Sequence, residues 1–153
     1  MEKEKTIEVL NTLIIINNDR IEGYETAAKE TNEYDLKNLF SQLASNSRRF
    51  KQELTSEVTK LGGQAEEGTK TTGKFFRVWM DVKAALTGKD RKAILSSCEF
   101  GEDNAVETYN DVLRNNLSDI TAVQQTLINA QYALIKTDHD KVKNMRDSLQ
   151  EHN

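Results

Sequence analysis

The amino-acid sequence predicts an all-α fold, a four-helix bundle in which one long crossover joins two helical hairpins. Apolar residues recur at steps of three and four along four long stretches, which is the period of an amphipathic helix. The chain has 153 residues and contains no proline, which helix interiors tolerate badly. Strand-like alternation of apolar and polar residues is not sustained anywhere. The length suits one domain, and we assign residues 1–153 to it.

The crossover, residues 62–88, decides how the hairpins are arranged. It begins at Gly62 and Gly63, where a left-handed helix end is expected, and it is far longer than a connection between antiparallel neighbours. Its second half predicts a short helix over residues 74–87, with the apolar face Phe75, Trp79, Val82 and Leu86. Residues 62–73 can reach about 40 Å at roughly 3.3 Å per residue, as far as a helix of about 25 residues. The flanking helices are therefore expected to run parallel, which is the ferritin-like arrangement.

Four long helices are predicted, each with one apolar stripe. They cover residues 6–30, 35–61, 90–114 and 119–149. The last three have Asp35, Asp90 and Ser118 as expected N-caps. The first stripe is Ile7, Leu10, Ile14, Asn18, Ile21, Glu25 and Ala28. The second is Leu36, Leu39, Leu43, Ser47, Phe50, Leu54, Val58 and Leu61. The third is Ile94, Cys98, Glu102, Ala105, Tyr109 and Val112. The fourth is Ile120, Val123, Leu127, Gln131, Leu134, Asp138, Val142, Met145 and Leu149.

Polar residues interrupt all four stripes. An offset of 84 residues relates the two halves and aligns Asn18 with Glu102. The same offset aligns Ser47 with Gln131. These four residues are expected to form an interior polar layer near mid-bundle, and Glu25 is expected nearer one end. Buried polar groups normally find hydrogen-bond partners, so we expect Glu102 to accept hydrogen bonds in this layer.

Four consecutive apolar residues, Leu13 to Ile16, cover more than one face of the first helix. Two explanations stay open at this point. The crossover covers the second face, or a second subunit covers it through Val9, Leu13 and Ile16. We expect a homo-oligomer, with a dimer favoured.

A bundle of this kind calls for a test of the di-iron carboxylate centre. Such a centre takes a Glu from each of two helices and a Glu-x-x-His pair from each of the other two. At the matching positions the second helix has Ser47 and Phe50, and the fourth has Gln131 and Leu134. These residues supply neither a carboxylate nor an imidazole. We therefore expect no metal ligands, no cofactor and no enzymatic activity.

The other chemistry-bearing residues have structural explanations. Glu99 is expected to be solvated, and Cys98 to be a small buried thiol rather than a nucleophile. Asp138 and His139 are expected to lie away from the polar layer, with His139 on a surface. Trp79 is expected to anchor the short crossover helix as a lid over the bundle.

Four strings in the sequence resemble one bacterial family. They are NDRIEGYETAA at 18–28, LGG at 61–63, WMDVKAALTG at 79–88 and CEFGED at 98–103. The family is a ferritin-like four-helix bundle catalogued as a domain of unknown function, and the resemblance covers nearly the whole chain. It implies the fold and supplies no reaction. It also implies structural roles for Asp19, Gly23, Tyr24, Trp79, Asp81, Lys83, Glu99, Gly101, Glu102 and Asp103.

Composition bounds the setting of the protein. The net charge is −4 with both signs interspersed, which gives no basic stripe for nucleic acid or anionic lipid. No apolar run approaches the length that spans a membrane. The charged N-terminus and the single cysteine favour a reduced, cytoplasmic location.

These observations favour a non-catalytic bundle with a structural or partner-binding role. The alternative is a degenerate metal-binding protein, either a metal-dependent oxidoreductase or a storage protein, that uses Glu102 and Glu25. A third possibility is a small-ligand binder with its pocket at the crossover.

Overall fold

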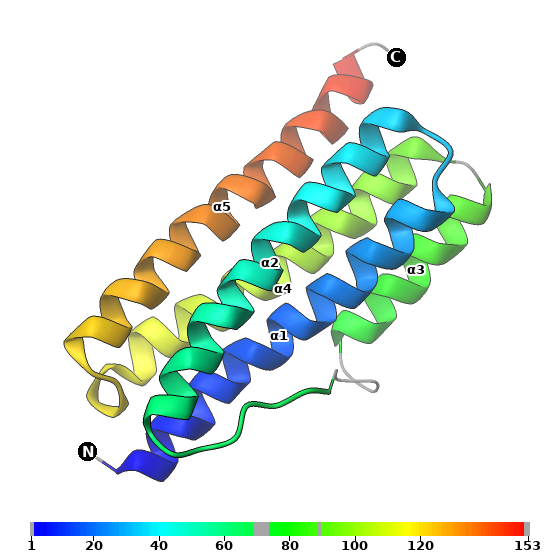
Figure 1. Cartoon of the computed structure of the whole chain (residues 1–153). Coiled ribbons are helices and arrows are strands. Elements are labelled where there is room, and N and C mark those ends of the chain that lie inside the picture. Colours follow the sequence, from blue (N-terminus) through cyan, green and yellow to red (C-terminus); the bar gives the residue numbers. More distant parts are fainter. Residues whose placement is uncertain (1, 69–73, 89, 152–153) are drawn as a thin grey trace.

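The computed structural model describes residues 2–68, 74–88 and 90–151, and the regular structure in these ranges is helical throughout (Figure 1). The helices are α1 (Lys3–Glu30), α2 (Tyr34–Lys60), α3 (Lys74–Gly88), α4 (Arg91–Asn115) and α5 (Ala122–Glu151), with a 3-10 turn, η1 (Leu117–Asp119), before α5. The all-helical bundle predicted from the sequence is confirmed. Within the described ranges, no helix combines the length and the apolar character needed to cross a membrane.

The chain that follows α2 runs back along α1. The Asn11 side chain donates to the Gln64 carbonyl at 3.1 Å and accepts from the Glu66 amide at 3.0 Å. Further along α1, Asn18 Nδ2 donates to the carbonyls of Glu66 and Gly68 at 3.1 and 3.0 Å. This segment lies beside α1, as Figure 1 shows, and α2 and α4 consequently point in the same direction. These contacts agree with the predicted path of the crossover as far as Gly68, and the rest of the predicted irregular stretch, residues 69–73, lies outside the described residues.

The short helix of the crossover, α3, lies against α1 and α4. Its Val82 is 1% exposed. The side chains of Phe75, Trp79 and Leu86 lie outside the described part of the structure. The lid contact expected of Trp79 therefore stays a prediction.

The buried face of α1 differs from the predicted stripe. Val9, Leu13 and Ile16 are buried within one chain, packed with residues of α2, α4 and α5. Of the two explanations left open for this face, the subunit interface through these three residues is contradicted, because helices of the same chain already cover them. Ile21 and Glu25, which the stripe placed inside, are partly exposed.

The buried face of α5 is also rotated from the predicted one. Val123 is 71% exposed and Leu134 is 40% exposed. Their sequence neighbours Gln124 and Ile135 are buried instead, and so is Ile128. Leu127 and Leu134 of the predicted stripe are each followed directly by another apolar residue, so two apolar stripes were possible. The structure buries the one that contains Ile128 and Ile135.

The ends of the helices depend on specific side chains. The start of α5 is fixed by a capping box: Thr121 Oγ1 accepts from the Gln124 amide at 3.1 Å, and Gln124 Oε1 accepts from the Thr121 amide at 3.0 Å. The predicted cap Ser118 is wrong, because it lies in η1. Asp90 caps α4 as predicted, accepting from the amide three residues further on at 3.1 Å. Asp35 is not the N-cap of α2, since it lies inside the first turn.

The core consists of two apolar clusters. One takes the N-terminal half of α1 and the C-terminal half of α2, and it includes Leu10, Phe50, Leu54 and Ile128. The other takes the opposite halves of the same helices, and it includes Tyr24, Phe40, Leu43 and Val142. Buried polar side chains lie between the two clusters.

Candidate functional site

One guanidinium occupies the middle of the bundle. Arg20, on α1, is fully buried. Its Nη1 donates to Ser47 Oγ at 2.7 Å, and its Nη2 donates to Glu102 Oε1 at 2.7 Å. Nη2 also lies 3.4 Å from Asp138 Oδ2. Because these partners come from α2, α4 and α5, the Arg20 side chain joins all four long helices.

Opposite charges and further hydrogen bonds compensate most of the buried polar atoms around this guanidinium, while Arg20 Nε and Glu102 Oε2 have no hydrogen-bond partner among the described residues. The Tyr24 hydroxyl donates to Glu102 Oε1 at 2.9 Å, and Asn46 Nδ2 lies 3.3 and 3.2 Å from the two carboxylate oxygens of Asp138. Burial alone would lower the pKa of Arg20, but Glu102, Tyr24 and Asp138 together more than offset this and raise the pKa, so the guanidinium stays charged. Burial raises the pKa of Glu102, and the charge of Arg20 opposes part of that rise.

A second set of hydrogen bonds continues across the bundle. The Tyr109 hydroxyl accepts from Asn17 Nδ2 at 2.8 Å and donates to Gln131 Oε1 at 2.7 Å. Gln131 Nε2 donates to the Phe50 carbonyl at 3.3 Å and to Glu53 Oε1 at 3.1 Å. Burial raises the pKa of Tyr109, which keeps its hydroxyl protonated. Together the two sets form what we name the polar layer: Asn17, Arg20, Tyr24, Asn46, Ser47, Glu102, Tyr109, Gln131 and Asp138.

The structure brings together some of the residues that the sequence placed in an interior layer. Ser47, Glu102 and Gln131 are buried in the polar layer. Asn18 is buried but binds the crossover chain, and so it faces away from the layer. Glu25 lies at the surface, where its Oε1 is 3.2 Å from Arg48 Nη2. The difference follows from the rotation of α1.

Sequence reasoning missed the centre of the layer, Arg20, together with Asn17, and it named Tyr24 only for the structural role that the family resemblance implies. These three residues continue the α1 face of Leu10 and Leu13 at steps of three and four, which was the available signal. An arginine on an otherwise apolar stripe is normally assigned to solvent, so the sequence favoured burial of the stripe that contains Ile21. Asp138 was also expected away from the layer, and this is wrong, since Arg20 reaches it across the bundle.

A second polar cluster lies where α4 faces α5. His139 Nε2 lies 2.6 Å from Asp103 Oδ1 and 4.0 Å from Glu99 Oε1. The other ring nitrogen, Nδ1, lies 3.2 Å from Asp140 Oδ1. Arg146 pairs with Glu99 through Oε2. Glu99 was expected to be solvated and His139 to be a surface residue, but their side chains are only 13% and 18% exposed.

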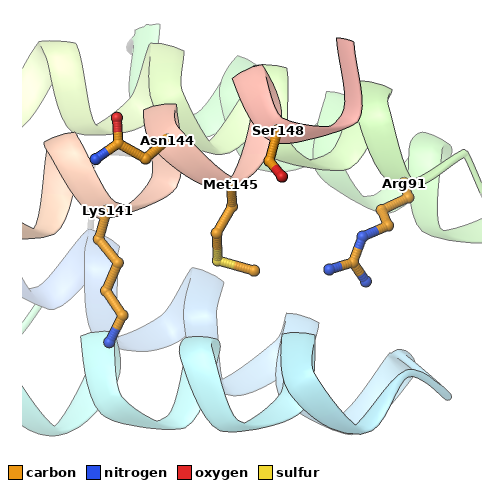
Figure 2. A pocket seen from close by; sticks show the side chains of 5 residues that line it. All are labelled: Arg91, Lys141, Asn144, Met145 and Ser148. Carbon is orange, nitrogen blue, oxygen red and sulfur yellow. The ribbon is translucent and has the colours of Figure 1, made fainter. Parts of the chain in front are cut away.

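A shallow groove of about 370 Å³ lies near the C-terminal end of α5. Figure 2 shows the side chains that line it, Arg91, Lys141, Asn144, Met145 and Ser148. Lys141 Nζ donates to Gln42 Oε1 on α2 at 2.8 Å, and Arg91 pairs with Asp35. Both cations that line the groove are thus engaged with side chains of the same chain, and we assign the groove no ligand.

The fold and the polar layer define the class of this protein, an all-helical bundle whose core is crossed by a buried ionic network. A sequence model of one protein family matches residues 5–115, from α1 to the end of α4. The chain belongs to this family, which is described as a domain of unknown function (DUF2383). None of the curated proteins compared with the chain matches it.

Proposed function

We propose that the protein is a non-catalytic bundle of the ferritin-like arrangement that acts by binding protein, beginning with a second copy of itself. The topology supports the first part of this proposal. Two antiparallel hairpins are joined by a crossover that follows α1 and leaves α2 and α4 parallel (Figure 1). One long crossover of this type is the hallmark of ferritin-like bundles.

The chemistry of the polar layer supports a structural role. A di-metal centre needs carboxylates that are free to bridge two cations at this height in the bundle. Here Glu102 Oε1 accepts from both Arg20 and Tyr24. The positive charge of a guanidinium bound to that oxygen would repel a metal ion. Ser47 and Gln131, which stand where carboxylate ligands would be needed, bind their neighbours as neutral groups.

One exposed stripe on α5 carries the partner-binding part of the proposal. We name it the α5 stripe: Val123, Thr126, Ala130, Ala133, Leu134 and Thr137, all exposed. Steps of three and four place these residues on one face of the helix, over about 21 Å at 1.5 Å per residue. The α5 stripe contains no ionisable side chain. It is the apolar side of α5 that the bundle does not use.

A second copy of the chain is the partner that fits this surface. Two copies related by a two-fold axis place the same patch against itself, and an uncharged patch meets no like charge when it does so. Ala130 and Ala133 let the two helices approach closely, and Val123 and Leu134 supply the apolar area that is exposed in the monomer. A homodimer through the α5 stripe therefore replaces the interface that the sequence suggested on α1.

The mass of the protein in solution tests this proposal. Size-exclusion light scattering over the micromolar range should give about twice the chain mass of 17.4 kDa. Leu134→Glu should reduce the mass to that of a monomer, because it places a charge in the interface. Gln125→Glu introduces the same negative charge at a partly exposed α5 position that is not three or four residues from any member of the stripe, and it should leave the dimer intact. A monomeric parent protein, or a Leu134→Glu variant that still dimerises, would overturn the proposal.

The same proposal places the protein in the cytoplasm, away from membranes and nucleic acid. Its one thiol, Cys98, is buried and free, as suits a reducing compartment. Its charges of both signs are interspersed along the chain, so neither nucleic acid nor an anionic membrane meets a continuous basic surface. Retention of the protein on heparin or on anionic vesicles at physiological salt would contradict this part.

A further inference from the structure

We propose that Glu99, Asp103 and His139 form a binding site for one divalent transition-metal ion of the zinc type, between α4 and α5. One potential ligand atom from each of the three residues lies within 4.8 Å of the other two. Glu99 and Asp103 are one turn apart on α4 and so project from the same face. His139 reaches them from α5, which brings the three ligands together across the hairpin.

The imidazole of His139 is held as a metal-ligating histidine is held. Such a residue almost always donates its second ring N–H to a carboxylate or carbonyl, which fixes the tautomer and aims the other nitrogen at the metal. The Asp140 carboxylate lies 3.2 Å from Nδ1 of His139 and can accept this proton. The remaining nitrogen, Nε2, then presents its lone pair between Asp103 and Glu99.

The two oxygens of Glu99 are assigned to different partners. Oε2 pairs with Arg146, whereas Oε1 faces His139 Nε2 at 4.0 Å. Arg146 also contacts Asp147, its Nη2 lying 2.9 Å from Oδ1. Arg146 fixes the orientation of Glu99 through Oε2 and leaves Oε1 facing the site, and its positive charge makes binding of a cation weaker than the three ligands alone would give. The Glu99 side chain is only 13% exposed, so the ligand is held in one position.

The set of ligands indicates the class of ion. One imidazole nitrogen and two carboxylate oxygens suit borderline divalent ions such as Zn²⁺, and no soft sulfur ligand is present among them. Three protein ligands leave at least one position for water. The Asp103 side chain is 58% exposed, which gives the ion access from solvent. Glu102, between the two carboxylates in sequence, points into the polar layer, so this site is separate from the interior network.

A bound ion would cross-link the hairpin formed by α4 and α5. The proposal does not depend on the homodimer, because none of its three ligands belongs to the α5 stripe. It also differs from the interior di-iron site that the sequence argues against, in both location and number of ions.

Calorimetric titration of chelator-treated protein with Zn²⁺ tests the site. The parent should bind one ion per chain with a saturable heat. His139→Gln should weaken binding by at least about 100-fold, and Asp140→Asn, which removes only the orienting carboxylate, by about 10-fold. Asp111→Asn removes an exposed carboxylate two turns beyond Asp103 and should leave binding unchanged.

A separate variant and a separate readout guard against loss of fold. Asp103→Asn changes a largely exposed ligand, so it should weaken Zn²⁺ binding while the metal-free protein melts with the parent. Zn²⁺ should raise the melting midpoint of the parent and leave that of His139→Gln unchanged. The proposal is overturned if the parent shows no saturable binding, or if His139→Gln and Asp103→Asn both bind Zn²⁺ as the parent does.

Discussion

Removal of the Arg20 guanidinium should be the most damaging single substitution in the polar layer. Arg20→Met keeps the apolar stem of the side chain but leaves the Glu102 carboxylate buried beside no cation. Asp138 loses the same partner. Removing one member of a buried ion pair costs about 3–5 kcal/mol. For a chain of this size, such a loss lowers the melting midpoint by about 6–20 °C.

Urea unfolding followed by circular dichroism measures this loss directly. The matched control is Arg48→Met, which removes an arginine paired with Glu25 at the surface, where the two side chains are 47% and 43% exposed. Exposed pairs contribute little, so the control should change the free energy of unfolding by less than about 0.5 kcal/mol. The loss in Arg20→Met should shrink as the pH falls. Burial raises the pKa of Glu102, and the protonated acid needs no counter-charge.

The double variant Arg20→Met/Glu102→Met separates the ion pair from the packing. With both charges gone, no uncompensated carboxylate remains between these two positions, so the double variant should be more stable than Arg20→Met alone. The reasoning is refuted if Arg20→Met costs less than about 1 kcal/mol. It is also refuted if the loss of stability in the double variant equals the sum of the losses in Arg20→Met and Glu102→Met measured singly.

Substitutions at Tyr109, Gly62 and Gly68 and a labelling experiment on Cys98 test other parts of the structure. Tyr109→Phe removes the hydroxyl between Asn17 and Gln131 and should cost about 1–3 kcal/mol in urea unfolding, because Gln131 Oε1 loses its donor. Gly62→Ala should cost about 1 kcal/mol, because Gly62 has φ of +79°, whereas Gly68→Ala, in open space, should be neutral or slightly stabilising. Burial raises the pKa of Cys98 well above its ordinary value, so a thiol reagent should label the native protein only at the rate of unfolding.

The buried faces of α2 and α4 could be predicted from the sequence, apart from buried residues such as Phe40 and Leu95, which the predicted stripes left out. Each has one dominant set of large apolar residues at steps of three and four, such as Leu36, Leu39 and Leu43 on α2, and the apolar neighbours Phe40 on α2 and Leu95 on α4 are buried beside that set. A helix with one apolar face has one way to pack, so periodicity alone was sufficient. For the same reason Ser47 and Glu102, the two polar members on these stripes, were placed correctly.

The faces of α1 and α5 could not be predicted in this way. Both helices carry adjacent apolar pairs, Leu13 with Ile14 on α1 and Leu127 with Ile128 on α5, so two stripes of nearly equal apolar content compete. The cluster at His139 was missed for the same reason. Its ligands come from α4 and α5, and their distance depends on the rotation of α5, which the sequence left open.

The polar layer explains which of the competing faces is buried. If α1 were rotated to bury Ile21 and Glu25, Arg20 would move towards solvent and Glu102 would be left in the core without a counter-charge. The cost of an unpaired buried carboxylate exceeds the gain from burying one more isoleucine, which is about 1.5–3 kcal/mol. Apolar packing alone therefore does not choose the face of α1. The buried face of α1 is set by the Glu102 carboxylate on α4, which needs the Arg20 guanidinium beside it, although sequence patterns assign Arg20 to the surface.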